Sequence, residues 1–242
     1  MRPNIHTDFI LSPITDTLKD VVSASSGIGS GIETFPLCDY IMQSVFLKMT
    51  GFQEQKMKCV CWELATVDYE YRYEFTKTPL GECSSYTDKQ RIYKDLIKQI
   101  EKYGLEFSKI DIDKKSILTT TFSDILNIFS NTNLSIWAQK DFVNFQTISN
   151  QIKESHFVSE KGSLFSDNSL KKMYENHLYR QRNRIAHNTF SYQQNLPTLK
   201  TLINEDYKFE NYFVYFSILV LIDKIFIELY KKYLKTIEEK EN

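Results

Sequence analysis

The sequence predicts an all-α protein, on three observations. Only 7 Gly and 5 Pro in 242 residues leave few of the tight turns that an all-β protein requires. Apolar residues recur at helical intervals of three and four along most of the chain. A hydrophobic content of 42%, with 14% aromatic residues, is enough for a large core and excludes wholesale disorder.

The first 35 residues differ from the rest of the chain. They contain Pro3, Pro13 and a run of small residues at 23–31, all of which interrupt regular structure. We therefore predict an N-terminal arm or loosely packed extension over residues 1–35, followed by one all-α domain over residues 36–242.

The domain begins with apolar residues at helical spacing from Leu37 to Met49, and a second helix is predicted from Gln53 onward, with Gly51 between them. The segment from Val67 to Phe75 alternates apolar and charged residues, which is the periodicity of a strand. No other segment offers a partner strand, and a single strand cannot satisfy its backbone hydrogen bonds. A helix is therefore favoured here.

The middle of the chain shows three further helical patterns. The clearest, Asp88 to Tyr103, is amphipathic and stops at Gly104. Two more are predicted over residues 116–129 and 133–152. Residues 163–167 are predicted to be a linker to the next helix.

Two helices complete the predicted bundle. One covers about residues 169–188, with Ser169 able to cap its start and Asn188 able to end it. The other, about residues 205–237, is long and apolar almost all round its middle. A helix of that kind needs two surfaces to bury against, which indicates the protein's own core on one face and a partner chain on the other.

Charge and cysteine content narrow the possible functions. The formal net charge of −1 excludes a protein coated with nucleic-acid-binding charge, so any RNA contact must come from a local patch. Between Ser169 and Phe190 there are five basic residues and a single acid, Glu175. The four cysteines lack zinc-site spacing, and neither a secretory signal nor a membrane-length apolar run is visible. We expect reduced thiols, no metal, no cofactor, no membrane contact and a cytoplasmic location.

The candidate chemistry lies in the hexapeptide Arg182-Asn183-Arg184-Ile185-Ala186-His187. An arginine stays charged and can bind two phosphate oxygens, whereas a histidine can transfer a proton near neutral pH. Arg182 and His187 are five residues apart, so on a straight helix they point roughly 140° away from each other. They can converge only if the helix ends or bends between them, or if two subunits share a site.

Other side chains of the same helix could line an RNA cleft. His177, Arg180, Arg184 and His187 form a stripe at helical spacing. Lys171 and Lys172 add positive charge, and Tyr179 could stack on an unpaired base. A solvated helix face explains the same pattern equally well.

The hexapeptide resembles the motif of HEPN-domain ribonucleases, an arginine followed by four to six residues and a histidine, with a polar residue favoured after the arginine. The resemblance covers a helical bundle in which one long helix follows the motif helix. It implies a metal-independent endoribonuclease that acts as a homodimer, with the motif helices facing each other across an RNA cleft. By position, Arg182 would bind the scissile phosphate, His187 would be the acid/base residue, and Asn183 would orient His187 or the phosphate. The expected reaction is attack by the RNA 2′-hydroxyl, which leaves a cyclic phosphate and a 5′-hydroxyl.

Several alternatives stay open at this point. Arg180 lies seven residues before His187 and could be the motif arginine instead, although Asn183 favours Arg182. The bundle could also be a non-catalytic module that binds RNA or assembles with a nuclease or nucleotidyltransferase. Residues before Asp88 could form a regulatory segment. The family further implies a toxin or antiphage effector with an antitoxin or defence-system partner.

Overall fold

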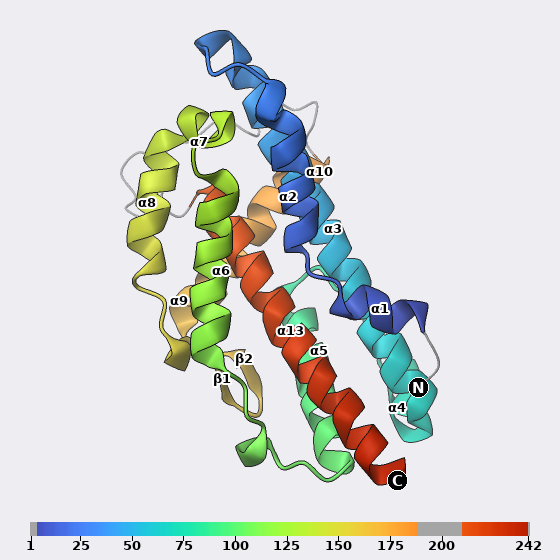
Figure 1. The fold of residues 1–242 in the computed structure, drawn as a ribbon. Helices are drawn as coiled ribbons and strands as arrows, with labels where there is room; N and C mark the ends of the chain where they lie inside the picture. The colour runs from blue at the N-terminus through green and yellow to red at the C-terminus, as the bar shows by residue number, and fades with distance from the viewer. Residues whose placement is uncertain (1–3, 188–209, 242) are drawn as a thin grey trace.

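The computed structural model describes residues 4–187 and 210–241 and confirms the all-α prediction (Figure 1), with 79% helix and 3% strand. The elements in chain order are α1 (Ile5–Leu11), α2 (Thr15–Ala24), α3 (Phe35–Val67), α4 (Tyr69–Lys77), α5 (Tyr86–Lys102), α6 (Lys114–Phe129), α7 (Asn133–Trp137), α8 (Gln139–Ser149), β1 (Phe157–Glu160), β2 (Ser163–Phe165), α9 (Asn168–Lys172), a π-helical segment (Met173–Tyr179), α10 (Arg180–His187) and α13 (Tyr212–Glu241). None of the helices in this part of the chain has both the length and the apolar character that crossing a membrane requires.

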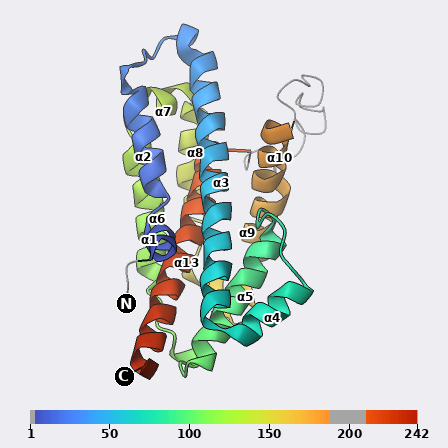
Figure 2. The ribbon, with the colours of Figure 1, turned by 90° about the vertical axis from the view of Figure 1, so that its right-hand side faces the viewer.

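Helix α13 is the centre of the bundle. It packs against α3, α5, α6 and α8, and its later part, around Tyr230, meets α1 across the same core (Figures 1 and 2). Phe213, Phe216 and Tyr230 are each at most 1% exposed. The sequence analysis assigned one face of this helix to a partner chain, and that assignment is wrong for the described residues, because neighbouring helices of the same chain cover both sides.

Residues 5–24 do not form a loose arm, contrary to the prediction for residues 1–35. Helices α1 and α2 pack on α3, and Ile10, Ile14 and Leu18 are at most 1% exposed. These apolar residues recur every four positions, a helical pattern that Pro13 interrupts only between the two helices. Helices α1 and α2 therefore belong to the bundle, whereas most residues from 26 to 34 are exposed.

Buried charges join the N-terminal helices to the rest of the bundle. The carboxylate of Asp223 on α13 lies 2.6 Å from Lys56 Nζ on α3 and accepts a hydrogen bond of 3.0 Å from the Ile14 backbone. Lys56 Nζ also donates to the Ser12 carbonyl. Lys56 is 2% exposed and Asp223 2%, so this contact is fully inside the protein.

Three local predictions about the elements are corrected and two are confirmed. Helix α3 runs unbroken through Gly51, where two helices were predicted. The single helix predicted over residues 133–152 is divided into α7 and α8. The predicted linker at 163–167 contains β2, which pairs antiparallel with β1. The ambiguous stretch after Val67 is helical, as favoured, and Gly104 does end α5 with a φ of 108°. The single hairpin was missed because its strands are only four and three residues long.

Candidate functional site

The motif helix is one continuous rod made of α9, the π-helical segment and α10 (Figures 1 and 2). Lys172 and Arg180, at the two junctions, both have right-handed helical backbone angles. The rod is preceded by Asp167 as N-cap residue, and the Ser169 hydroxyl donates to the Asp167 carboxylate, so Ser169 is not the cap that the sequence analysis expected. Asn188, the predicted stop, lies outside the described residues.

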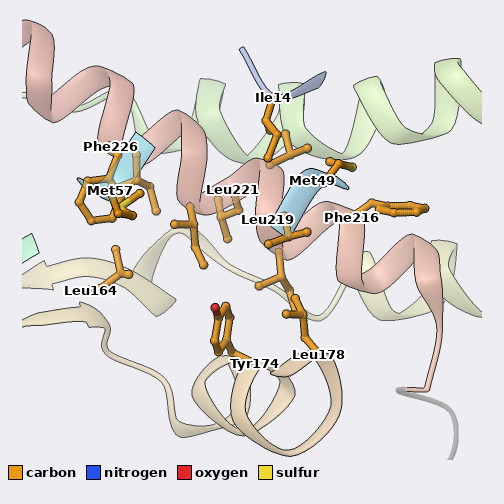
Figure 3. Close-up of a cluster of buried hydrophobic side chains, with 14 of the residues drawn as sticks. Ile14, Met49, Met57, Leu164, Tyr174, Leu178, Phe216, Leu219, Leu221 and Phe226 are labelled. Carbon is orange, nitrogen blue, oxygen red and sulfur yellow. The ribbon is translucent and has the colours of Figure 1, made fainter. Parts of the chain in front are cut away.

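The wide π turns decide which way Arg182 points. In a regular α-helix Arg182 would lie roughly 120° round the axis from Leu170, beyond the apolar stripe. In the π-helical segment, hydrogen bonds join residues i and i+5, so each residue turns through a smaller angle. Leu170, Tyr174 and Leu178 are at most 2% exposed, and Arg182, four residues further on, follows on the same inward face. Figure 3 shows Tyr174 and Leu178 pointing toward Leu219 of α13.

Arg182 is held in place by two side chains. Its Nη2 lies 3.1 and 3.3 Å from the two carboxylate oxygens of Glu54 on α3, and its Nη1 donates to Asn183 Oδ1 at 3.1 Å. The side chains of Arg182 and Glu54 are 22% and 13% exposed. Arg182 therefore forms a salt bridge with Glu54, and Asn183 also orients its guanidinium.

His187 lies on a different side of the motif helix from Arg182. Both residues belong to α10, which is regular α-helix from Arg180 to His187, so the roughly 140° divergence remains. His187 and Ala186 are exposed, whereas Arg182 turns inward. The described residues of one chain thus do not bring the two motif side chains together.

The six candidate RNA-binding residues divide by exposure. Lys172 and Arg180 are exposed, which leaves Arg180 free to be the motif arginine on the outer surface. The other four are half-buried: Lys171, His177, Tyr179 and Arg184. Among them, Lys171 Nζ lies 5.6 Å from the centre of the Tyr86 ring on α5, so its charge faces an aromatic side chain.

Sequence reasoning missed two charged residues beside Arg182. Glu54 and Lys89 are distant in sequence, yet both line a cleft beneath the arginine, together with Ser84, Tyr174 and others from α3, α5 and the motif helix. The burial of Lys89 could have been predicted from the sequence, since Lys89 lies three residues before Ile92 and therefore on the apolar face of α5. A lysine in that register predicts a buried cation.

A larger hollow lies elsewhere, between α4 and α5. It has a volume of about 450 Å³ and is lined by charged and aromatic side chains, among them Phe75, Arg91, Asp95 and Lys102. None of the motif residues lines it. Within residues 4–187 and 210–241 no group of His, Cys, Asp and Glu is arranged to hold a metal ion.

Comparison with known proteins adds no family assignment: no family model, no curated protein and no solved structure matches this chain. The function has to be argued from the residues themselves.

Proposed function

We propose that this protein is a metal-independent endoribonuclease of the HEPN type, acting as a homodimer. The observation that carries the proposal is the fixed position of Arg182, which is half-buried at the final helical turns of the motif and hydrogen-bonded to its neighbour Asn183. A guanidinium held in this way loses little conformational freedom when it binds a phosphate. The exposed cations Lys172 and Arg180 on the same helix give an RNA strand a positively charged approach.

In the proposed reaction Arg182 binds the scissile phosphate and stabilises the negative charge that develops on it. His187 transfers a proton to or from the reacting oxygens, and Asn183 keeps the guanidinium oriented. Because Arg182 and His187 diverge on one helix, the site combines Arg182 of one chain with His187 of a second, packed through the motif helices. By the same resemblance, we expect a cytoplasmic toxin or antiphage effector with a restraining partner protein.

The experiment is cleavage of total RNA in excess chelator by the wild type, Arg182→Ala and His187→Ala. Matched controls are Arg72→Ala, an exposed arginine on α4, and His156→Ala, a half-buried histidine beside the hairpin. We expect the wild type and both controls to cleave and both motif variants to be inactive. New ends should carry a 5′-hydroxyl, which a polynucleotide kinase labels without prior phosphatase treatment. Cleavage that neither motif substitution affects would contradict the site.

A second candidate function is a non-catalytic RNA-binding or assembly module. The observation that favours it is the Glu54–Arg182 ion pair, which gives the arginine a structural partner. RNA that binds without being cleaved, with affinity lowered by Arg180→Ala, would favour this module over the enzyme.

A further inference from the structure

The cleft beneath Arg182 is narrow, and both charged and apolar side chains line it. The side chains pack so tightly that no space of water size remains inside it. Tyr174, which is 2% exposed, forms part of its wall and donates its hydroxyl hydrogen to the Ser84 carbonyl at 2.7 Å. Charged groups in such a place must be compensated by one another or by a bound ion.

Lys89 is the deepest charge in this cleft. It is 1% exposed, and its ammonium donates to the Cys83 carbonyl at 2.7 Å and lies 5.7 Å from the centre of the Tyr174 ring. An ammonium has three hydrogens to donate, so one carbonyl does not satisfy it. Burial lowers the pKa of Lys89 to about 8, against the attraction of Glu54, which raises it.

Glu54 faces two cations at once. Its carboxylate accepts both hydrogen bonds from Arg182 Nη2, and its charge also acts on Lys89. The carboxylate of Asp88 also acts on Lys89, whereas Glu54 is hydrogen-bonded to Arg182 and acts on Lys89 from a distance. Two fixed cations around a carboxylate have the charge and the donors that a phosphate group needs.

We propose that Lys89 and Arg182 together form a phosphate-binding site, which Glu54 occupies with its own carboxylate in the free protein. This inference shares Arg182 with the proposed function and deepens it, because it adds Lys89 as a second phosphate-binding residue and Glu54 as an internal competitor. Arg182 supplies a planar pair of donors and Lys89 a compact point charge. A phosphate enters when the Glu54 side chain rotates outward from the rim of the cleft.

The test uses inorganic phosphate and the full chain, with binding followed by ³¹P NMR and by the phosphate-dependent rise in Tm, at ionic strength matched with chloride. Glu54→Gln keeps the shape of the side chain and removes the competing charge. We expect it to bind phosphate about tenfold more tightly than the wild type. Adding Lys89→Met should abolish that gain, whereas adding Lys98→Met, an exposed lysine on the same helix α5, should leave it unchanged.

Two results would overturn the inference: phosphate affinity in Glu54→Gln no higher than in the wild type, or a gain that persists without Lys89. If Glu54→Gln does not fold, the single variant Lys89→Met tests the site instead. We expect this variant to fold, because it replaces a buried charge by an apolar chain of similar length. Loss of the wild-type Tm rise at high phosphate then supports the site, and an unchanged rise contradicts it. If the protein binds phosphate as expected but does not cleave RNA, this inference stands and the proposed enzymatic function is contradicted. If the protein cleaves RNA but Glu54→Gln does not bind phosphate more tightly, the proposed function stands and this inference is contradicted.

Discussion

Lys89 and Arg182 carry like charges into one narrow cleft, and the Glu54 carboxylate makes their proximity tolerable. The cost of removing the charge from water differs for the two cations. Arg182 keeps part of its side chain in water, whereas Lys89 is fully withdrawn from it. Burial therefore affects mainly the pKa of Lys89, which falls from 10.5 to about 8. Because of this lowered pKa, the free energy of unfolding should depend on pH.

We predict that Lys89→Met changes the pH dependence of the free energy of unfolding. Between about pH 8 and 10.5 the unfolded chain keeps a proton on Lys89 that the folded chain has released, so Lys89 favours the folded state increasingly as pH rises. Relative to the wild type, the stability of Lys89→Met should therefore fall by up to about 3 kcal/mol between pH 7 and pH 10.5. Urea unfolding at several pH values measures this difference.

The lysines, cysteines and tyrosines that do not interact with Lys89 titrate in both proteins, so their contributions cancel in the comparison. A stability difference that stays flat across this pH range would show that Lys89 is not held at a lowered pKa.

At the scale of elements, two features position the site. The π-helical segment keeps Arg182 on the inward face of the motif helix, beside α3. Asp223 of α13 contacts both Lys56 of α3 and the backbone of Ile14, between α1 and α2. This buried contact fixes α3 against α13 and so positions Glu54, which α3 also carries. Burial lowers the pKa of Lys56 and raises that of Asp223, and each group's charge opposes the effect of burial on the other.

We predict that Asp223→Asn lowers the free energy of unfolding by about 3–5 kcal/mol, because it leaves the Lys56 charge buried without a counter-charge. The double variant Lys56→Met with Asp223→Leu removes both charges and should recover most of that loss. Urea unfolding followed by circular dichroism measures both variants. If the double variant is as unstable as the single one, the cost lies in the lost hydrogen bonds to Ile14 and Ser12 rather than in the unpaired charge.

At the scale of the whole molecule, most of α13 is covered by its own chain, so we expect the proposed dimer to form through another surface. The motif helix lies at the side of the bundle, with α10 reaching its outer edge (Figure 2), and α10 exposes Arg180 and His187. A second chain facing this helix is the arrangement that would bring His187 of one subunit to Arg182 of the other.

We predict that mixing the Arg182→Ala and His187→Ala proteins restores part of the RNA cleavage that each lacks alone. In a mixed dimer, one chain supplies the intact arginine and the other the intact histidine of the same site. The measurement is cleavage rate against mixing ratio, with light scattering to confirm a dimer. A mixture as inactive as its components, although dimeric, would place both residues of a working site in the same chain.

Local pattern was enough to predict the all-α class and most of the helices. The spacing of apolar residues in α5 and the stop at Gly104 depend on neighbours within a few positions, which the sequence shows directly. The same reasoning failed for residues 5–24 and for Gly51. Proline and glycine residues predict local interruptions of a helix. In the N-terminal segment, the packing of Ile10, Ile14 and Leu18 on α3 outweighs this local preference.

The sequence by itself determined the helical class and the motif helix, because both depend on contacts between residues close in the chain. Only the tertiary structure decided that Arg182 pairs with Glu54, that Lys89 lies beneath it, and that the first two thirds of α13 are buried by its own chain. The physical reason is distance along the chain. Arg182 and Glu54 are 128 positions apart, and no local periodicity encodes which of many carboxylates will meet a given arginine.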